Sequence, residues 1–282
     1  HKPGAGPYGK LLDDAIDYVL STRKPNGILS VPTSGITVSY NHAIAGLMLG
    51  EVYGMTEGSR SALVADTITE ALKATWSIQL SPKSRIDAGG WRYTTATNDP
   101  AVSPDSDLSV TGWHLMFLRS AKNAEFDVPE GSIEQALKYV RRCFMNDRGK
   151  FRFSYMVGKK KPTRAMTATG ILSLILGGQE DDQMVKAAAD TLLREFRETG
   201  RAAANVEYYF YYTIYYCSQA MAQLGQPYWE VYYPKLVTEL TANQDSSGAW
   251  NYRRSKVSTT YNTAMAVLAL SPPYQMLPIY QK

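Results

Sequence analysis

Apolar residues recur along this chain with helical periodicity in ten segments, which form five successive pairs. Each pair belongs to a repeat of roughly 50 to 65 residues. Strict alternation of apolar and polar residues over a strand length is rare, so the pattern predicts an all-helical protein. The expected pairs are 11–20 with 40–49, 62–76 with 109–118, 133–144 with 165–176, 185–196 with 207–224, and 232–240 with 261–270.

The two helices of each pair differ in polarity. The first helix carries charge on one side, as in 192–198, which is typical of a helix with one face in water. The second helix is nearly free of charge all round, as in 165–176, which is typical of a helix buried on every side. Two concentric layers, polar outside and apolar inside, satisfy both patterns. A straight solenoid would need a wetted face on its second helices, which this chain does not show.

The turns within the pairs combine glycine with a following aromatic residue. The run 244–250 (Gln-Asp-Ser-Ser-Gly-Ala-Trp), followed by the apolar helix 261–270, resembles the repeat of squalene cyclases and protein prenyltransferase β subunits. Gly89-Gly90-Trp91 with Trp113-His114-Leu115 repeats this signature, and Gly149-Lys150-Phe151 is a looser copy. The resemblance covers nearly the whole chain as a pattern.

This resemblance implies a single domain, residues 1–282, folded as an α/α toroid. In that fold the ends of the inner helices surround a central cavity. Closed toroids of the family have about six hairpins, so five hairpins imply an open ring or a ring that lacks its first hairpin.

Composition adds an excess of tyrosine, with 20 Tyr against 7 Phe. Tyrosine joins a large apolar ring to a hydroxyl that needs a partner, so the excess suggests a cavity or an interface. The net charge of +4 is too small to indicate nucleic acid, and we expect the basic cluster of Lys159, Lys160, Lys161 and Arg164 to be a solvated loop. No apolar run is long enough for a transmembrane segment, so we expect a soluble protein.

Two cysteines, Cys143 and Cys217, exclude a disulfide framework and lack the spacing of a structural zinc site. One bridge between them stays open as an alternative, so they do not define the compartment. The chain starts His1-Lys2-Pro3-Gly4, without methionine, which is compatible with a removed leader. The sequence therefore leaves the localisation unknown.

Squalene-hopene cyclases use an Asp-x-Asp-Asp motif whose protonated carboxyl acts as the general acid on an alkene. The nearest match here is Asp105-Ser106-Asp107-Leu108, in which leucine replaces the last aspartate. Asp105 and Asp107 are therefore the candidate catalytic residues. The structural alternative is that Asp107 caps the helix that begins at Leu108, and the two roles are compatible.

Metal binding has little support in the sequence. Prenyltransferases of the family bind zinc through Asp, Cys and His, but no Asp lies two residues before Cys217. A cluster of His42, His114 and Asp107 is conceivable, although lone histidines on buried helices are usually hydrogen-bonded structural residues. Asp13, Asp14 and Asp17 fit a magnesium-diphosphate pattern, but they lie in the first turn of an outer helix. We expect no metal and no cofactor.

The strongest local signal is the run 207–216, which is rich in tyrosine. Helical spacing places Tyr208, Tyr211, Tyr212 and Tyr215 on one face and directs Tyr209 and Tyr216 elsewhere. Such a row of tyrosine rings, which we call the tyrosine wall, could face a cation, a sugar ring or a polycyclic lipid. The alternative is plain packing between the layers. Tyr40, Trp113 and Tyr261 have comparable places near the starts of other second helices. We therefore expect them at the same mouth of the predicted central cavity.

These features lead to three functional hypotheses. The first is binding of a hydrophobic, isoprenoid-like ligand in an aromatic-lined cavity, with polar contacts from Asp105, Asp107, His42, His114 and Glu207. The second is a terpenoid cyclase that uses Asp105 or Asp107 as its acid. The third is a non-enzymatic module that holds a protein or a glycan. Its candidate aromatic patch is Tyr228, Trp229, Tyr232 and Tyr233.

Overall fold

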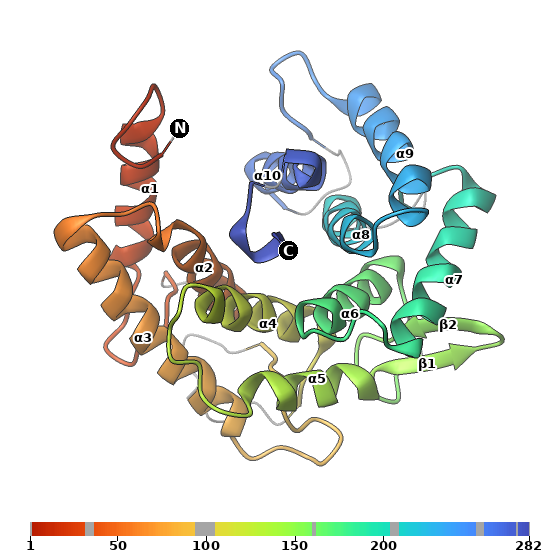
Figure 1. Ribbon diagram of the computed structural model, residues 1–282, viewed down its shortest axis with the longest axis horizontal. Helices are drawn as coiled ribbons and strands as arrows, with labels where there is room; N and C mark the ends of the chain where they lie inside the picture. The colour runs from red at the N-terminus through yellow and green to blue at the C-terminus, as the bar shows by residue number, and fades with distance from the viewer. Residues whose placement is uncertain are drawn as a thin grey trace. The chain divides into compact units, whose positions relative to one another are not determined.

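The computed structural model describes residues 2–31, 37–93, 105–159, 162–203, 209–251, 257–274 and 276–281. These residues are mostly helical, and each of the ten expected helices is found in the expected order. The chain divides into two compact units, His1–Arg142 and Cys143–Lys282, which we call the N-terminal and the C-terminal unit (Figure 1).

The N-terminal unit holds two helix pairs and the first helix of the third. In it α2 packs against α4, and α3 packs against α1, α2 and α4. The bounds are α1 Gly9–Ser21, α2 Val38–Tyr53, α3 Gly58–Leu80, α4 Leu108–Asn123 and α5 Ser132–Arg142.

The C-terminal unit opens with a β-hairpin and continues with the remaining helices. In it α8 packs between α6 and α10, while α7 packs against α6 and α9 packs against α8 (Figure 1). The bounds are β1 Phe144–Asp147, β2 Lys150–Phe153, α6 Arg164–Leu176, α7 Gln183–Thr199, α8 Phe210–Leu224, α9 Tyr228–Asn243, α10 Thr259–Leu270, η2 Pro272–Tyr274 and η3 Pro278–Tyr280.

Burial separates the two kinds of helix as their polarity predicts. All 13 residues of α6 are buried, and α4 is buried along most of its length. Helix α5 instead buries one face, which includes Leu137, Tyr139 and Val140, and exposes charged residues on the other. The distinction between first and second helices is therefore confirmed for these elements.

A repeated hydrogen bond ties three of the glycine-containing turns to the second helix of their own pair. The backbone N–H groups of Leu29, Trp91 and Trp250 each donate at 3.1 Å to a side chain on that helix. The acceptors are His42 Nδ1, Thr111 Oγ1 and Thr263 Oγ1. Because the same donor position is satisfied in the same way, the internal repeat is structural as well as sequential.

A second repeated contact ties each turn to the first helix of the next pair. Gly27 and Gly89 have φ of +79° and +88°, and a Cβ on them would lie 2.4 Å from Glu70 O in α3 and 2.3 Å from Gln135 O in α5. In the C-terminal unit, Phe151 N donates to Thr191 Oγ1 in α7 at 3.1 Å. Ala202 N likewise donates to Glu239 Oε1 in α9 at 2.8 Å.

The third turn departs from the all-helical prediction. We expected a helix to Phe144, but α5 ends at Arg142 and an antiparallel hairpin follows, with Phe144 opposite Phe153. Arg148 and Gly149 form its two-residue turn, with φ of +53° and +81°. Strand β2, Lys-Phe-Arg-Phe, alternates polar and apolar residues over only four positions, the shortest length at which alternation indicates a strand.

No helix in the described part of the chain combines the length and the hydropathy needed to cross a bilayer.

Candidate functional site

In the N-terminal unit, contacts between α2 and α4 bring together Tyr40, His42, Asp107 and His114, and Trp113 precedes His114 on α4. Trp113 and both histidines are buried. The structure therefore gathers the predicted residues of this unit into one region, which we call the histidine cluster. Hydrogen bonds within the unit engage Tyr40, Asp107 and both histidines.

Asp107 is the N-cap of α4, as the structural alternative predicted. Its Oδ1 accepts hydrogen bonds from Val110 N at 2.9 Å and from Ser109 Oγ at 2.5 Å. The Ser109 hydroxyl also lies 2.5 Å from the Tyr40 hydroxyl. The carboxylate thus orders the first turn of the helix, since a cap satisfies an otherwise unpaired amide.

Asp105 lies two residues before this cap and is partly exposed. It forms an ion pair with Arg92, 3.1 Å between Nη1 and Oδ2. The Arg92 guanidinium also lies over the ring of Tyr93, 5.3 Å from its centroid. The two candidate acids therefore have different surroundings, one paired with a cation and one with helix and hydroxyl donors.

His42 has both ring nitrogens engaged. Leu29 N donates to Nδ1 at 3.1 Å, so Nε2 carries the proton and faces Thr75 Oγ1 at 2.9 Å. Burial lowers the pKa of His42 to about 4, since the charged form loses its hydration. His42 is therefore a neutral structural residue at neutral pH.

His114 stacks on Trp91, with ring centroids 4.7 Å apart and planes at 3°. Its Nε2 lies 3.0 Å from Ser39 Oγ, whereas Nδ1 has no hydrogen-bond partner among the described residues. Burial holds its pKa well below the usual range, and the nearby His42 and Lys83 lower it further. The described residues contain no group of three metal-ligating side chains.

In the C-terminal unit, tyrosines on α8, α10 and η3, together with the N-cap of α8, form what we call the tyrosine cluster, which consists of Tyr209, Tyr211, Tyr212, Tyr215, Tyr216, Tyr261 and Tyr280. Tyr211, Tyr215 and Tyr216 are buried, Tyr212 and Tyr261 are partly buried, and Tyr209 is 64% exposed. The hydroxyls of Tyr215 and Tyr280 are 2.9 Å apart. Two residues predicted for this wall, Glu207 and Tyr208, lie outside the described residues.

Tyr216 corrects the prediction for this wall. Helical spacing predicted that it points away, but its ring lies 4.8 Å from that of Tyr212 and 5.0 Å from that of Tyr215. Tyr212 and Tyr216 are four residues apart and so share a helix face. Burial raises the pKa of Tyr216 well above its usual range, and that of Tyr261 as well.

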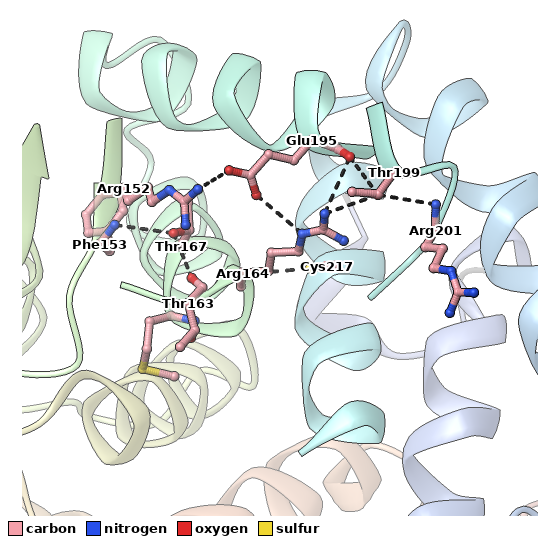
Figure 2. Close-up of polar contacts among 10 residues, drawn as sticks. Arg152, Phe153, Thr163, Arg164, Thr167, Glu195, Thr199, Arg201 and Cys217 are labelled. Carbon is pink, nitrogen blue, oxygen red and sulfur yellow. Dashed lines mark hydrogen bonds and ion pairs between the residues drawn. The ribbon is translucent and has the colours of Figure 1, made fainter. Parts of the chain in front are cut away.

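Arg164 corrects a second prediction, because it is not a loop residue in water. It is the first residue of α6, and its side chain is 7% exposed. Its Nε lies 3.3 Å from Glu195 Oε2, and Arg152 pairs with the other oxygen of the same carboxylate (Figure 2). Its Nη2 donates to Thr199 Oγ1 at 3.2 Å. Two guanidinium groups therefore share one buried carboxylate.

This arginine–glutamate network joins β2, α6 and α7, and no sequence pattern predicted it. The Arg164 guanidinium also lies 5.3 Å from the ring centroid of Phe196, in cation–π range. A further carboxylate, that of Glu239, interacts electrostatically with Arg164 and Arg201. Burial raises the pKa of Glu239, while the amides of Ala202 and Ala203 and the two arginines counter that rise.

The aromatic patch proposed for a binding module is only partly exposed. Tyr232 is fully buried, and its hydroxyl donates to Ile214 O at 3.2 Å. Trp229 and Tyr233 are partly exposed and stack on each other, with centroids 4.4 Å apart. The Tyr228 hydroxyl donates to Asp190 Oδ1 at 2.8 Å. Tyr232 therefore belongs to the core of the C-terminal unit.

Comparison with known proteins assigns no family to this site. No protein-family model and no curated protein sequence matches the chain.

Proposed function

We propose that the protein binds a hydrophobic, isoprenoid-like ligand at the tyrosine cluster. The observation that carries the proposal is the graded solvent exposure of the rings in this cluster. Tyr209 is exposed, Tyr212 and Tyr261 are partly buried, and Tyr211 and Tyr215 are buried. Partly buried rings next to an exposed one offer a ligand an aromatic surface that the fold has already ordered. The toroid layout implied by the sequence resemblance is part of this proposal.

The polarity of the helices supports an apolar ligand. Neither α8 nor α10 contains a charged residue, so a charged group on the ligand would have only hydroxyls and ring faces to replace its hydration. Tyrosine rings supply apolar area, and their hydroxyls can bond one polar group such as an alcohol. An isoprenoid alcohol or hydrocarbon fits this environment.

Both candidate acids have structural roles, and neither role by itself indicates proton transfer. Asp107 Oδ1 is occupied by the helix cap, and Asp105 is paired with Arg92. Each aspartate therefore has a structural use in the N-terminal unit that does not require proton transfer. The cyclase hypothesis has no further observation in its favour.

A direct binding experiment tests the proposal. Farnesol and squalene would be titrated into the full chain while tyrosine and tryptophan fluorescence and native mass spectra are recorded. We expect saturable binding that weakens about tenfold in Tyr212→Ala and in Tyr261→Ala, since each loses one ring contact. The matched control is Tyr18→Ala, an exposed tyrosine on α1.

Two outcomes would contradict the proposal. One is the lack of saturable binding by either probe. The other is binding that is equally strong in the two cluster variants and in the control. Cyclic products formed from squalene would support the cyclase hypothesis instead, and their loss in Asp107→Asn would identify the acid.

A further inference from the structure

The arginine–glutamate network of the C-terminal unit has one more positive group than negative groups. Arg152 and Arg164 share the carboxylate of Glu195 (Figure 2). The side chains of the two arginines are 18% and 7% exposed, and that of the glutamate is 10% exposed. A charge is costly to bury unless an opposite charge balances it. The network is therefore one negative charge short.

One nitrogen shows where that negative charge belongs. Nε of Arg164 pairs with Glu195 Oε2 at 3.3 Å, and Nη2 donates to Thr199 Oγ1 at 3.2 Å and to Glu195 O at 3.4 Å. Nη1, by contrast, is buried and has no hydrogen-bond partner among the described residues. Figure 2 shows it turned away from the Glu195 carboxylate. Its two N–H groups therefore need an acceptor that the described residues do not supply.

This end of the Arg164 guanidinium lies close to the protein surface. Nη2 bonds to the hydroxyl of Thr199, which is exposed, as are the following residues Gly200 and Arg201. The backbone N–H of Arg201 donates to the same hydroxyl at 3.4 Å. The guanidinium is therefore one hydrogen bond away from an exposed segment that carries a further cation.

Glu239 is a carboxylate of the chain that senses both cations, and it does not remove the excess of positive charge. Its Oε1 accepts a hydrogen bond from Ala202 N at 2.8 Å, and it interacts electrostatically with Arg201 and Arg164. Burial raises the pKa of Glu239, which disfavours its charged form. Even with Glu239 ionised, the three arginines of this region face only two carboxylates, so one positive charge remains.

We propose that Nη1 of Arg164, supported by the charge of Arg201, binds a small oxyanion, either a carboxylate or a phosphate group. Such a group supplies both the missing negative charge and the missing acceptors, and hydrogen bonds between ionised groups are the strong ones. Guanidinium suits carboxylate and phosphate oxygens better than an ammonium group does. All residues of the site belong to the C-terminal unit. The proposal does not rest on ligand binding at the tyrosine cluster.

Titration of the full chain with inorganic phosphate, followed by calorimetry at constant ionic strength, tests the proposal. A second titration with acetate distinguishes a carboxylate site from a phosphate site. We expect saturable binding of one anion per chain for at least one of the two probes. Arg164→Lys keeps a positive charge next to Glu195 but lacks Nη1, so it should weaken binding about tenfold or more. The control Arg194→Lys changes an exposed arginine on α7 and should bind like the parent.

Glu239→Gln tests the site in the opposite direction. It keeps an oxygen for Ala202 N but removes a negative charge that repels the bound anion, so binding should tighten about threefold or more. Glu230→Gln, an exposed position on the same helix, is its control. A purely structural network would not bind more tightly in Glu239→Gln, so this variant decides the question even if Arg164→Lys does not fold. No saturable binding of either anion, binding in Glu239→Gln that equals the parent's, or equal changes in the controls would each overturn the proposal.

Discussion

At the scale of single residues, burial decides what the predicted polar side chains do. His42 and His114 looked alike in sequence, as lone histidines on apolar helices, and both are neutral and buried. Only the three-dimensional contacts assign the protons, because Leu29 N occupies Nδ1 of His42. The polar candidates of the N-terminal unit thus stabilise the fold, whatever else they contact.

The lowered pKa of His42 predicts that the protein loses stability in acid. Its folded pKa is about 4 and its unfolded pKa is 6.5, so the unfolded state binds the extra proton as pH falls between these values. The stabilisation is complete above pH 6.5 and is lost as pH falls towards 4. At pH 5 the free energy of unfolding should be about 2 kcal/mol lower on account of this residue.

Urea unfolding at about pH 7.5 and about pH 5 would measure this loss. In His42→Gln the difference between the two pH values should shrink by that amount, and the remainder should report the similarly buried His114. A pH dependence identical in parent and variant would show that His42 does not titrate as its burial requires.

The hairpin turn supplies a second prediction for a single residue. Arg148 has φ of +53°, where asparagine is favoured over arginine, and its side chain is exposed. Arg148→Asn should therefore raise the free energy of unfolding by about 0.5–1 kcal/mol. Arg148→Val, which is β-branched, should lower it, and equal stabilities of the two variants in thermal unfolding would refute the strain.

At the scale of elements, glycine and buried charge fix how one helix pair meets the next. Gly89 lies against the carbonyl of Gln135, and Glu195 joins α7 to α6 and β2 through Arg164 and Arg152. Neither contact is encoded locally, because Gly89 and Gln135, or Glu195 and Arg164, are distant in sequence. Substitutions at these two contacts therefore test how the elements pack against one another.

The glycine contact can be separated from backbone strain by a matched pair of variants. Gly89 and Gly248 both have positive φ, but only Gly89 has a close neighbour among the described residues. Gly248→Ala should cost about 1 kcal/mol from strain alone, and Gly89→Ala about 3 kcal/mol or more from strain plus the clash with a backbone oxygen. Chemical denaturation measures both, and equal costs would exclude the close contact.

The arginine–glutamate network predicts a large loss of stability when its carboxylate is removed. Glu195→Gln leaves the buried guanidinium of Arg164 and the partly buried guanidinium of Arg152 without their shared anion and should lower the free energy of unfolding by about 3–5 kcal/mol. Glu198→Gln, an exposed position on the same helix, is the control and should change it by less than about 0.5 kcal/mol. Similar free energies of unfolding for the two variants in urea titrations would show that the network does not stabilise the fold.

At the scale of the whole molecule, the sequence determined the order, the number and the two polarities of the helices. It could do so because helical periodicity and charge distribution are local properties, as are the Gly-aromatic turns and the Asp107 cap. The third turn is the exception, since its strands are only four residues long and the alternation in β2 is too short to stand out.

Only the tertiary structure decided which charged and aromatic residues meet. Arg164 lies in a basic stretch that is typical of a solvated loop. Its side chain is nevertheless buried and pairs with the carboxylate of Glu195, 31 residues later. Tyr216 joins the tyrosine cluster through ring contacts with Tyr212 and Tyr215, and the Tyr215 hydroxyl meets that of Tyr280 on η3. The exposed side of α10 follows from the lack of a further helix on it among the described residues of its own unit. Such partners depend on packing between distant segments, which local sequence patterns do not specify.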